Sequence, residues 1–97
     1  SLGIGTAMNN IGCVLFRDKN YTKAINHFEK ALSIRKKIDN KIGIAESLEC
    51  LVETHLNIKN FKQAKRYLVL SIDNYKKLGN DRRVGELNKK LTSLKNE

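Results

Sequence analysis

Residues that could act as catalysts or metal ligands are few in this sequence and lie far apart. The two histidines, His27 and His55, are 28 residues apart, and the two cysteines, Cys13 and Cys50, do not form a CxxC pair. Neither an HExxH sequence nor a glycine-rich phosphate-binding loop occurs. A zinc site needs closely grouped ligands, and a nucleophilic thiol needs a neighbouring base. We therefore expect no catalytic residue, no metal site and no cofactor, and a protein that is not an enzyme.

The cysteine content and the absence of long apolar runs indicate a soluble cytoplasmic protein. Two cysteines do not make the disulfide framework of small secreted domains, so both are expected to be free thiols. No run approaches the length of about 20 apolar residues that a membrane-spanning helix needs. Helical periodicity begins next to Ser1 without an initiator methionine, so we expect a fragment of a longer protein.

The formal net charge of +9 indicates two possible classes of partner, nucleic acids and acidic protein or membrane surfaces. Proteins that bind single-stranded nucleic acid combine basic patches with exposed aromatic rings. Most aromatic residues of this sequence instead occupy positions that are expected to pack in the core. We expect weak, salt-sensitive attraction to nucleic acid without sequence recognition. The basic residues expected to face outward are Lys19, Lys23, Lys30, Arg35, Lys36, Lys37, Lys59, Lys62, Lys65, Arg66, Lys76 and Lys77.

The sequence matches itself at a shift of 40 residues, so that Lys19-Asn20-Tyr21 returns as Lys59-Asn60-Phe61. Apolar residues recur every three or four positions, which is typical of a helix with one buried face. This spacing is found at Ile4, Met8, Ile11 and Leu15, and again at Ile44, Leu48, Leu51 and His55. Two repeated units are therefore expected, followed by the first helix of a third.

Turn residues between the periodic segments predict helices over about 3–17, 21–38, 42–58, 61–78 and 82–95. Short antiparallel pairs bury their apolar faces only by stacking on one another. The expected fold is all-α, a right-handed superhelical stack of antiparallel helix pairs (an α-α solenoid). It forms one domain over 1–97, with repeats at about 3–40 and 43–80 and a capping or partial-repeat helix at about 82–95. The residues expected in its core include Ile11, Leu15, Ala24, Phe28, Leu32, Leu51, Ala64, Leu68 and Ile72.

The sizes of residues in each unit resemble those of a tetratricopeptide repeat. Unit one has Met8 at the large apolar place, Ile11-Gly12 for the Leu-Gly pair, Leu15 at the tyrosine place, and Ala24, Phe28 and Ala31 for the Ala-Phe-Ala series. Unit two follows with Leu48, Leu51, His55, Ala64, Leu68 and Ser71, although Val52 replaces the glycine. No proline ends either second helix, and the 40-residue unit is similar to the longer repeats of kinesin light chains and bacterial Rap-type regulators.

This resemblance implies that the first helix of each pair lines a concave groove for a peptide or a partner helix. The candidate partner-binding residues, chosen opposite the apolar stripe, are Asn9, Asn10, Cys13, Arg17, Glu46, Glu49, Glu53, Asn57, Lys89 and Lys90. Asn10 resembles the asparagine with which long-repeat members hold the backbone of an extended peptide. The three glutamates predict an acidic strip for a basic ligand side chain, with basic residues at both ends for an acidic one. The alternative is an ordinary solvated helix surface.

The expected function is therefore an adaptor or scaffold module that binds a protein or peptide. One alternative is a sensor or dimerisation domain of a larger signalling regulator, with self-association. A nucleic-acid-binding scaffold acting through the basic outer surface is a third hypothesis.

Overall fold

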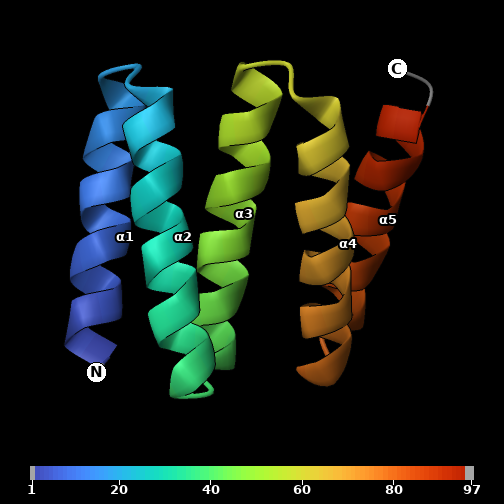
Figure 1. Ribbon diagram of the computed structural model, residues 1–97. Coiled ribbons are helices and arrows are strands. Elements are labelled where there is room, and N and C mark those ends of the chain that lie inside the picture. Colours follow the sequence, from blue (N-terminus) through green and yellow to red (C-terminus); the bar gives the residue numbers. More distant parts are fainter. Residues whose placement is uncertain (1, 96–97) are drawn as a thin grey trace.

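The computed structural model describes residues 2–95, which form five α-helices joined by short turns (Figure 1). The helices are α1 (Leu2–Arg17), α2 (Tyr21–Lys37), α3 (Lys41–Asn57), α4 (Phe61–Lys77) and α5 (Asp81–Lys95). Each predicted helix is present, and its ends lie within one residue of the prediction. Among the described residues, no helix has both the length and the apolarity needed to cross a membrane.

One type of turn joins all the helices and accounts for their regular spacing. The residue at each of positions 19, 39, 59 and 79 adopts the left-handed conformation, with φ between 52° and 72°. The next residue is always asparagine, and the Oδ1 atoms of Asn40 and Asn80 each accept a hydrogen bond of 3.1 Å from the backbone N–H three residues later. The left-handed residue ends one helix, and the asparagine begins the next.

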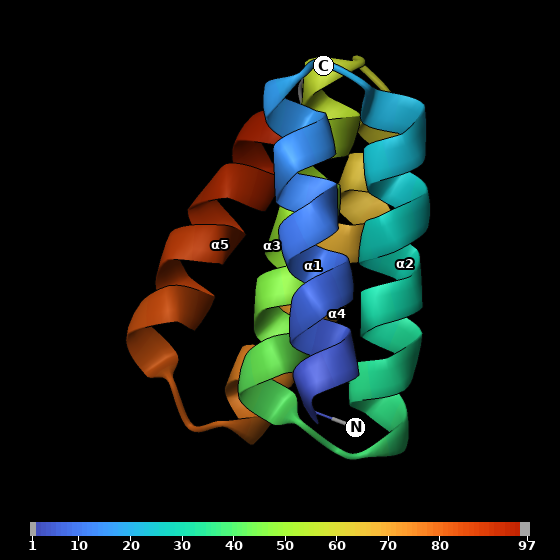
Figure 2. The same ribbon diagram turned by 90° about the vertical axis from the view of Figure 1, so that its left-hand side faces the viewer.

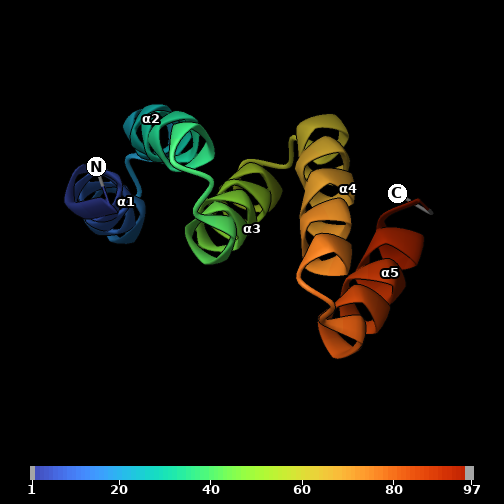
Figure 3. The ribbon, with the colours of Figure 1, turned by 90° about the horizontal axis from the view of Figure 1, so that it is seen from below.

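The helices alternate between two sides of a slab with Cα extents of 34 × 31 × 16 Å. Viewed end-on in Figure 3, α1, α3 and α5 lie on one side and α2 and α4 on the other, and Figure 2 shows the same slab from its edge. We call these two surfaces the inner face and the outer face. Each helix packs on the next one in the chain, and α1 also contacts α3. This arrangement confirms the predicted all-α solenoid of stacked helix pairs.

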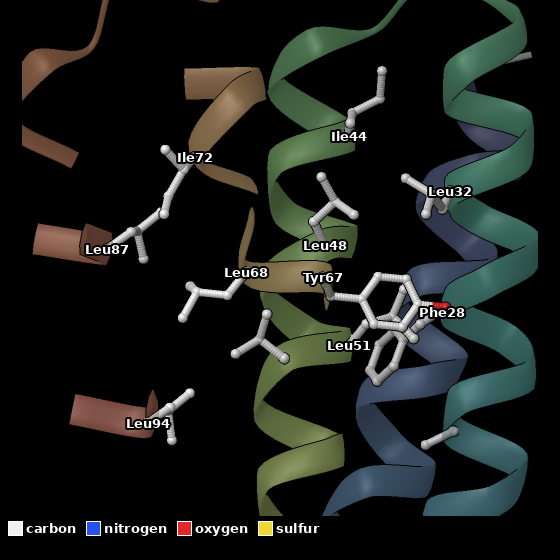
Figure 4. Packing of buried hydrophobic residues seen from close by; sticks show 12 residues of the cluster. Phe28, Leu32, Ile44, Leu48, Leu51, Tyr67, Leu68, Ile72, Leu87 and Leu94 are labelled. Carbon is white, nitrogen blue, oxygen red and sulfur yellow. The ribbon is translucent and has the colours of Figure 1, made fainter. Parts of the chain in front are cut away.

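A continuous apolar core runs from α2 to α5 between the two faces (Figure 4). Phe28 is 1% exposed, and its ring packs so closely on α1 that a Cβ atom added to Gly12 would lie 2.6 Å from Phe28 Cε1. The glycine therefore permits the close approach of α1 and α2. Seven of the nine residues predicted to be buried are at most 7% exposed: Ala24, Phe28, Leu32, Leu51, Ala64, Leu68 and Ile72.

The predicted burial of Ile11 and Leu15 is wrong. Ile11 is 44% exposed and Leu15 is half-buried, although their equivalents one repeat later, Leu51 and His55, are 0% and 7% exposed. The stripe on α3 is covered because α3 lies between α2 and α4, whereas α1 packs only on α2 and α3 in the described chain. The buried side of α1 is instead a polar and glycine-rich stripe that contains Asn9.

Candidate functional site

The candidate residues lie on α1, α3 and α5, the helices of the inner face. On α1, Asn10, Cys13 and Arg17 are three and four residues apart and therefore share one side of the helix. Asn10 and Arg17 are exposed, and Cys13 is half-buried. On α3 and α5, Asn57 and Lys89 are exposed. Asn57 Nδ2 donates a hydrogen bond of 2.9 Å to the backbone oxygen of Glu53 in its own helix.

Asn9 is not available to a ligand, contrary to the prediction. Its side chain is buried between α1 and α3, and the residue is 2% exposed. Nδ2 donates to Glu46 Oε1 at 3.1 Å, and Oδ1 accepts from Ser47 Oγ at 3.0 Å. A buried amide is stable in a helix interface only when its polar atoms are bonded, as they are here. Asn9 therefore connects two helices instead of facing a groove.

Arg35 belongs to the same buried network, so the prediction that it faces outward is wrong. It is 3% exposed, and its Nη1 lies 2.9 Å from Ser47 Oγ, 3.0 Å from the Gly43 oxygen and 3.1 Å from Glu46 Oε1. A Cβ atom on Gly43 would lie 2.8 Å from Arg35 Cδ, and one on Gly5 would lie 3.0 Å from Arg35 Cγ. These two glycines leave room for the buried arginine, although the Gly43 position is also crowded by the Asn40 side chain.

The acidic strip on α3 is already paired within the molecule. Glu49 Oε1 accepts from Arg83 Nη2 at 2.8 Å and from the Tyr75 hydroxyl at 2.5 Å. Burial and this bond to Glu49 raise the pKa of Tyr75, so its hydroxyl stays protonated as a donor. Glu53 Oε1 lies 2.6 Å from Lys90 Nζ, and Glu46 pairs with Arg35 as described. Because Arg83 and Tyr75 lie far from Glu49 in the sequence, sequence analysis missed both partners.

A hollow of about 260 Å³ opens between α1 and α3 on the inner face. Its lining is mostly apolar and consists of Cys13, Phe16, Arg17, Phe28 and Cys50. Burial, followed by the proximity of Cys13, raises the pKa of Cys50 to about 12. Cys50 is therefore a neutral thiol near pH 7, which behaves as a small apolar group and not as a nucleophile.

Arg17 is the unpaired charge at this hollow. Of the ion pairs formed within residues 2–95, none includes Arg17, whereas Glu46, Glu49, Glu53 and Lys90 each have an oppositely charged partner. The same part of the chain contains no group of three or more His, Cys, Asp or Glu side chains placed to hold a metal ion. The inner face thus offers an apolar hollow beside one free cation.

Residues 3–77 match a protein-family model described as tetratricopeptide repeat. The matched part includes nearly all of α1 and the whole of α2, α3 and α4. Comparisons with curated proteins and with solved structures gave no significant match.

Proposed function

Because this chain belongs to the tetratricopeptide repeat family, whose members are protein–protein interaction modules, we propose that its inner face binds a peptide segment of a partner protein. The observation that carries the proposal is the hollow between α1 and α3, with Arg17 at its edge. Peptide-binding sites commonly combine an apolar pocket with a few polar groups that orient the ligand.

The ligand side chain that fits this hollow is apolar and of medium size. Cys13, Cys50, Phe16 and Phe28 supply thiol and ring atoms, and a volume of about 260 Å³ accommodates one leucine, methionine or phenylalanine side chain. Burial of that side chain contributes on the order of 1.5–3 kcal/mol. The hollow therefore supports an apolar anchor in the bound peptide.

The charges of the inner face support an acidic group beside that anchor. Arg17 is exposed and unpaired among the described residues, so a ligand carboxylate gains an ion pair without breaking one. A basic ligand residue would instead compete with Arg83 for Glu49 or with Lys90 for Glu53. We therefore place the acidic group of the ligand near Arg17. Glu46 and Glu53, whose side chains are 59% and 53% exposed, are secondary positions for a basic one.

Asn10 supports an extended peptide backbone at the same place. It lies one turn before Cys13 on α1, is exposed, and has an amide that both donates and accepts hydrogen bonds. The proposed ligand therefore lies along α1, with backbone contacts at Asn10, its apolar side chain in the hollow and its acidic group at Arg17.

The experiment is to select peptides on the intact domain from an unbiased display library and to measure their affinities by fluorescence anisotropy. Arg17→Glu is expected to weaken the selected peptides about five- to tenfold, because it replaces attraction by repulsion. Cys13→Met narrows the hollow and is expected to weaken peptides with the largest apolar anchors most. Lys62→Glu is the matched control, since Lys62 is exposed on the outer face and the change in net charge is the same.

The proposal is contradicted if Arg17→Glu and Lys62→Glu have equal effects, or if the selected peptides lack an apolar residue next to an acidic one. Peptides that are uniformly basic and bind through Glu46 and Glu53 would restore the acidic strip as the binding site.

Self-association is a second candidate function, and the exposed apolar side of α1 favours it. Ile11 is 44% exposed and Val14 is 52% exposed, which leaves an apolar helix surface open to another helix. Sedimentation velocity over a range of concentrations tests this candidate. A dimer that Ile11→Lys abolishes supports it, whereas a monomer at all concentrations contradicts it.

A further inference from the structure

A second surface, independent of the inner face, lies between α2 and α4. The backbones of these two helices are separated, since no Cα atom of α2 lies within 8 Å of one in α4. Two neighbouring hollows of about 330 Å³ and about 260 Å³ occupy the space between them and share Lys36 and Leu70 in their linings. We call this region the outer groove. The groove runs along the helix axes, from Glu29 and Arg66 at one end to Asp39 and Lys77 at the other.

The floor of the outer groove is apolar. Leu32 of α2 and Ile44 and Leu48 of α3 line its base, and Leu70 of α4 forms part of its wall. Leu70 is 38% exposed, so its side chain is covered only in part by the domain itself. A groove with this floor suits a row of apolar side chains.

Four basic and three acidic side chains line the outer groove, and the two helices that form its walls are basic overall. α2 and α4 each contain five basic residues and one acidic residue, so together they hold eight of the nine net positive charges of the chain, although one of these residues, Arg35, is buried and paired with Glu46. Two of the three carboxylates of the groove form ion pairs, Asp39 with Lys41 at 2.8 Å and Asp73 with Lys77 at 3.4 Å, whereas Glu29 accepts a hydrogen bond of 3.0 Å from the neutral Tyr67 hydroxyl.

Lys36 and Arg66 are the groove cations that have no carboxylate partner within the described chain. Lys36 lines both hollows, and Arg66 lines the smaller one from the opposite helix. Arg66 donates to the neutral Gln63 Oε1 at 3.2 Å, and its guanidinium lies over the Tyr67 ring. The two free cations therefore lie on opposite walls of one groove, above its apolar floor.

We propose that the outer groove binds an amphipathic helix of a partner protein. Its apolar stripe covers Leu32, Ile44 and Leu70, and acidic residues on both sides of that stripe pair with Lys36 and Arg66. A helix fits because its apolar residues recur at i, i+3, i+4 and i+7 and form a narrow stripe with polar flanks. Charge complementarity selects the acidic flanks.

The same observations favour a protein helix over a nucleic acid. Single-stranded nucleic acid needs exposed aromatic rings on which bases stack, and Tyr67, the aromatic residue of the groove, is 6% exposed. Phosphates also gain nothing from the leucine and isoleucine floor. An apolar floor with two opposed cations matches a helix that is both apolar and acidic.

The test uses the intact domain and a fluorescent synthetic helix of about five turns, with a leucine stripe flanked by glutamates. Its binding is followed by anisotropy and its location by amide shifts in two-dimensional NMR spectra. A scrambled peptide of equal composition, a single-stranded oligonucleotide and vesicles of anionic phospholipid are the comparison probes. We expect saturable binding of the amphipathic helix, with the largest amide shifts at Ser33, Lys36, Leu70 and Asn74.

The decisive comparison is between two double variants with the same change in net charge. Lys36→Glu with Arg66→Glu is expected to weaken the helix about tenfold or more, whereas Lys30→Glu with Lys62→Glu, both outside the groove, is expected to change it less than about threefold. Leu70→Gln tests the apolar part of the groove wall and is expected to weaken binding without changing net charge. Circular dichroism melts check that each variant is folded.

Equal weakening by the two double variants would show diffuse charge attraction and overturn the proposal. Equal binding of the scrambled peptide, tighter binding of the oligonucleotide or vesicles, or no binding of the helix would also overturn it. Arg17→Glu should leave this binding unchanged, which separates the outer groove from the inner face.

Discussion

Arg83 Nη2 lies 2.8 Å from Glu49 Oε1, and this ion pair connects α5 to α3 across the inner face. No Cα atom of α3 lies within 8 Å of one in α5, so long side chains make the connection. The Lys90–Glu53 pair at 2.6 Å has the same effect about two turns further along α5 and one turn further along α3. The glutamates that a ligand was expected to contact therefore also hold the last helix in place.

Charge reversal of Glu49 alone is expected to destabilise the domain. Glu49→Lys places two like charges together, and with side chains about a third exposed the loss is about 1 kcal/mol in urea unfolding. The exchanged pair, Glu49→Arg with Arg83→Glu, should recover most of this loss. If the exchanged variant is stable but binds a partner as the wild type does, Glu49 does not recognise the ligand by its charge.

Phe28→Ala is expected to cost about 3–5 kcal/mol, because the ring is 1% exposed and fills the space beside Gly12. Denaturant melts followed by circular dichroism measure the change. A loss under about 1 kcal/mol would mean that Phe28 does not occupy the core position described.

Gly12→Ala and Gly85→Ala make the same chemical change within a helix, with opposite expected results. The Cβ atom added at Gly12 would lie 2.6 Å from Phe28 Cε1, so the ring or the helix must move, and stability falls by about 1–3 kcal/mol. The Cβ atom at Gly85 meets nothing within 4 Å, so the better helix propensity of alanine raises stability by up to about 1 kcal/mol. Thermal melts that show the same sign for both would contradict this packing.

His55 is expected to make stability fall at mildly acidic pH. Its ring is 7% exposed and stacks on Tyr67, and burial lowers the pKa of His55 from its usual 6.5, opposed in part by Glu29. The unfolded chain then binds a proton more readily than the folded one. The contribution of the neutral His55 ring to the free energy of unfolding is fully present above about pH 6.5. It is lost as the pH falls from there through the lower pKa that His55 has in the folded chain.

Urea unfolding at about pH 7.5 and about pH 5 measures this effect. His55→Phe keeps an aromatic ring on Tyr67 and should reduce the pH dependence, whereas His27→Gln, on the surface of α2, should leave it unchanged. If the stability of His55→Phe depends on pH as strongly as that of the wild type, groups other than His55 cause the pH dependence.

Lys59→Gly is expected to stabilise the domain by about 0.5–1 kcal/mol. Lys59 has a φ of 59°, a conformation that costs a residue with a Cβ atom about 1–2 kcal/mol, and the greater freedom of glycine in the unfolded chain offsets part of the gain. The reverse change at the equivalent turn, Gly79→Ala with a φ of 72°, should lower stability by a similar amount. Thermal melts of the two variants check these opposite signs.

The helices and their ends were predictable because their signals are local. A turn with an asparagine every 20 residues, as at Asn40 and Asn60, and apolar residues every three or four positions depend only on neighbours along the chain. The inward-facing Ala24, Phe28 and Leu68 followed from the same periodicity. The family resemblance rested on these local size patterns as well, and the match over residues 3–77 agrees with it.

The tertiary structure decided which side of α1 is buried and which charges of the inner face form ion pairs. Ile11 and Asn9 are two positions apart on α1, and periodicity placed the isoleucine inside and the asparagine outside, the reverse of what is observed. The apolar stripe is buried only where another helix covers it, and the amide is buried because Ser47 and Glu46 satisfy its hydrogen bonds. Likewise Glu49 and Arg83, 34 residues apart in the chain, become a pair only when α5 packs on α4 and lies on the same face as α3. Burial and ion pairing depend on which surfaces meet in space, and local periodicity does not specify that.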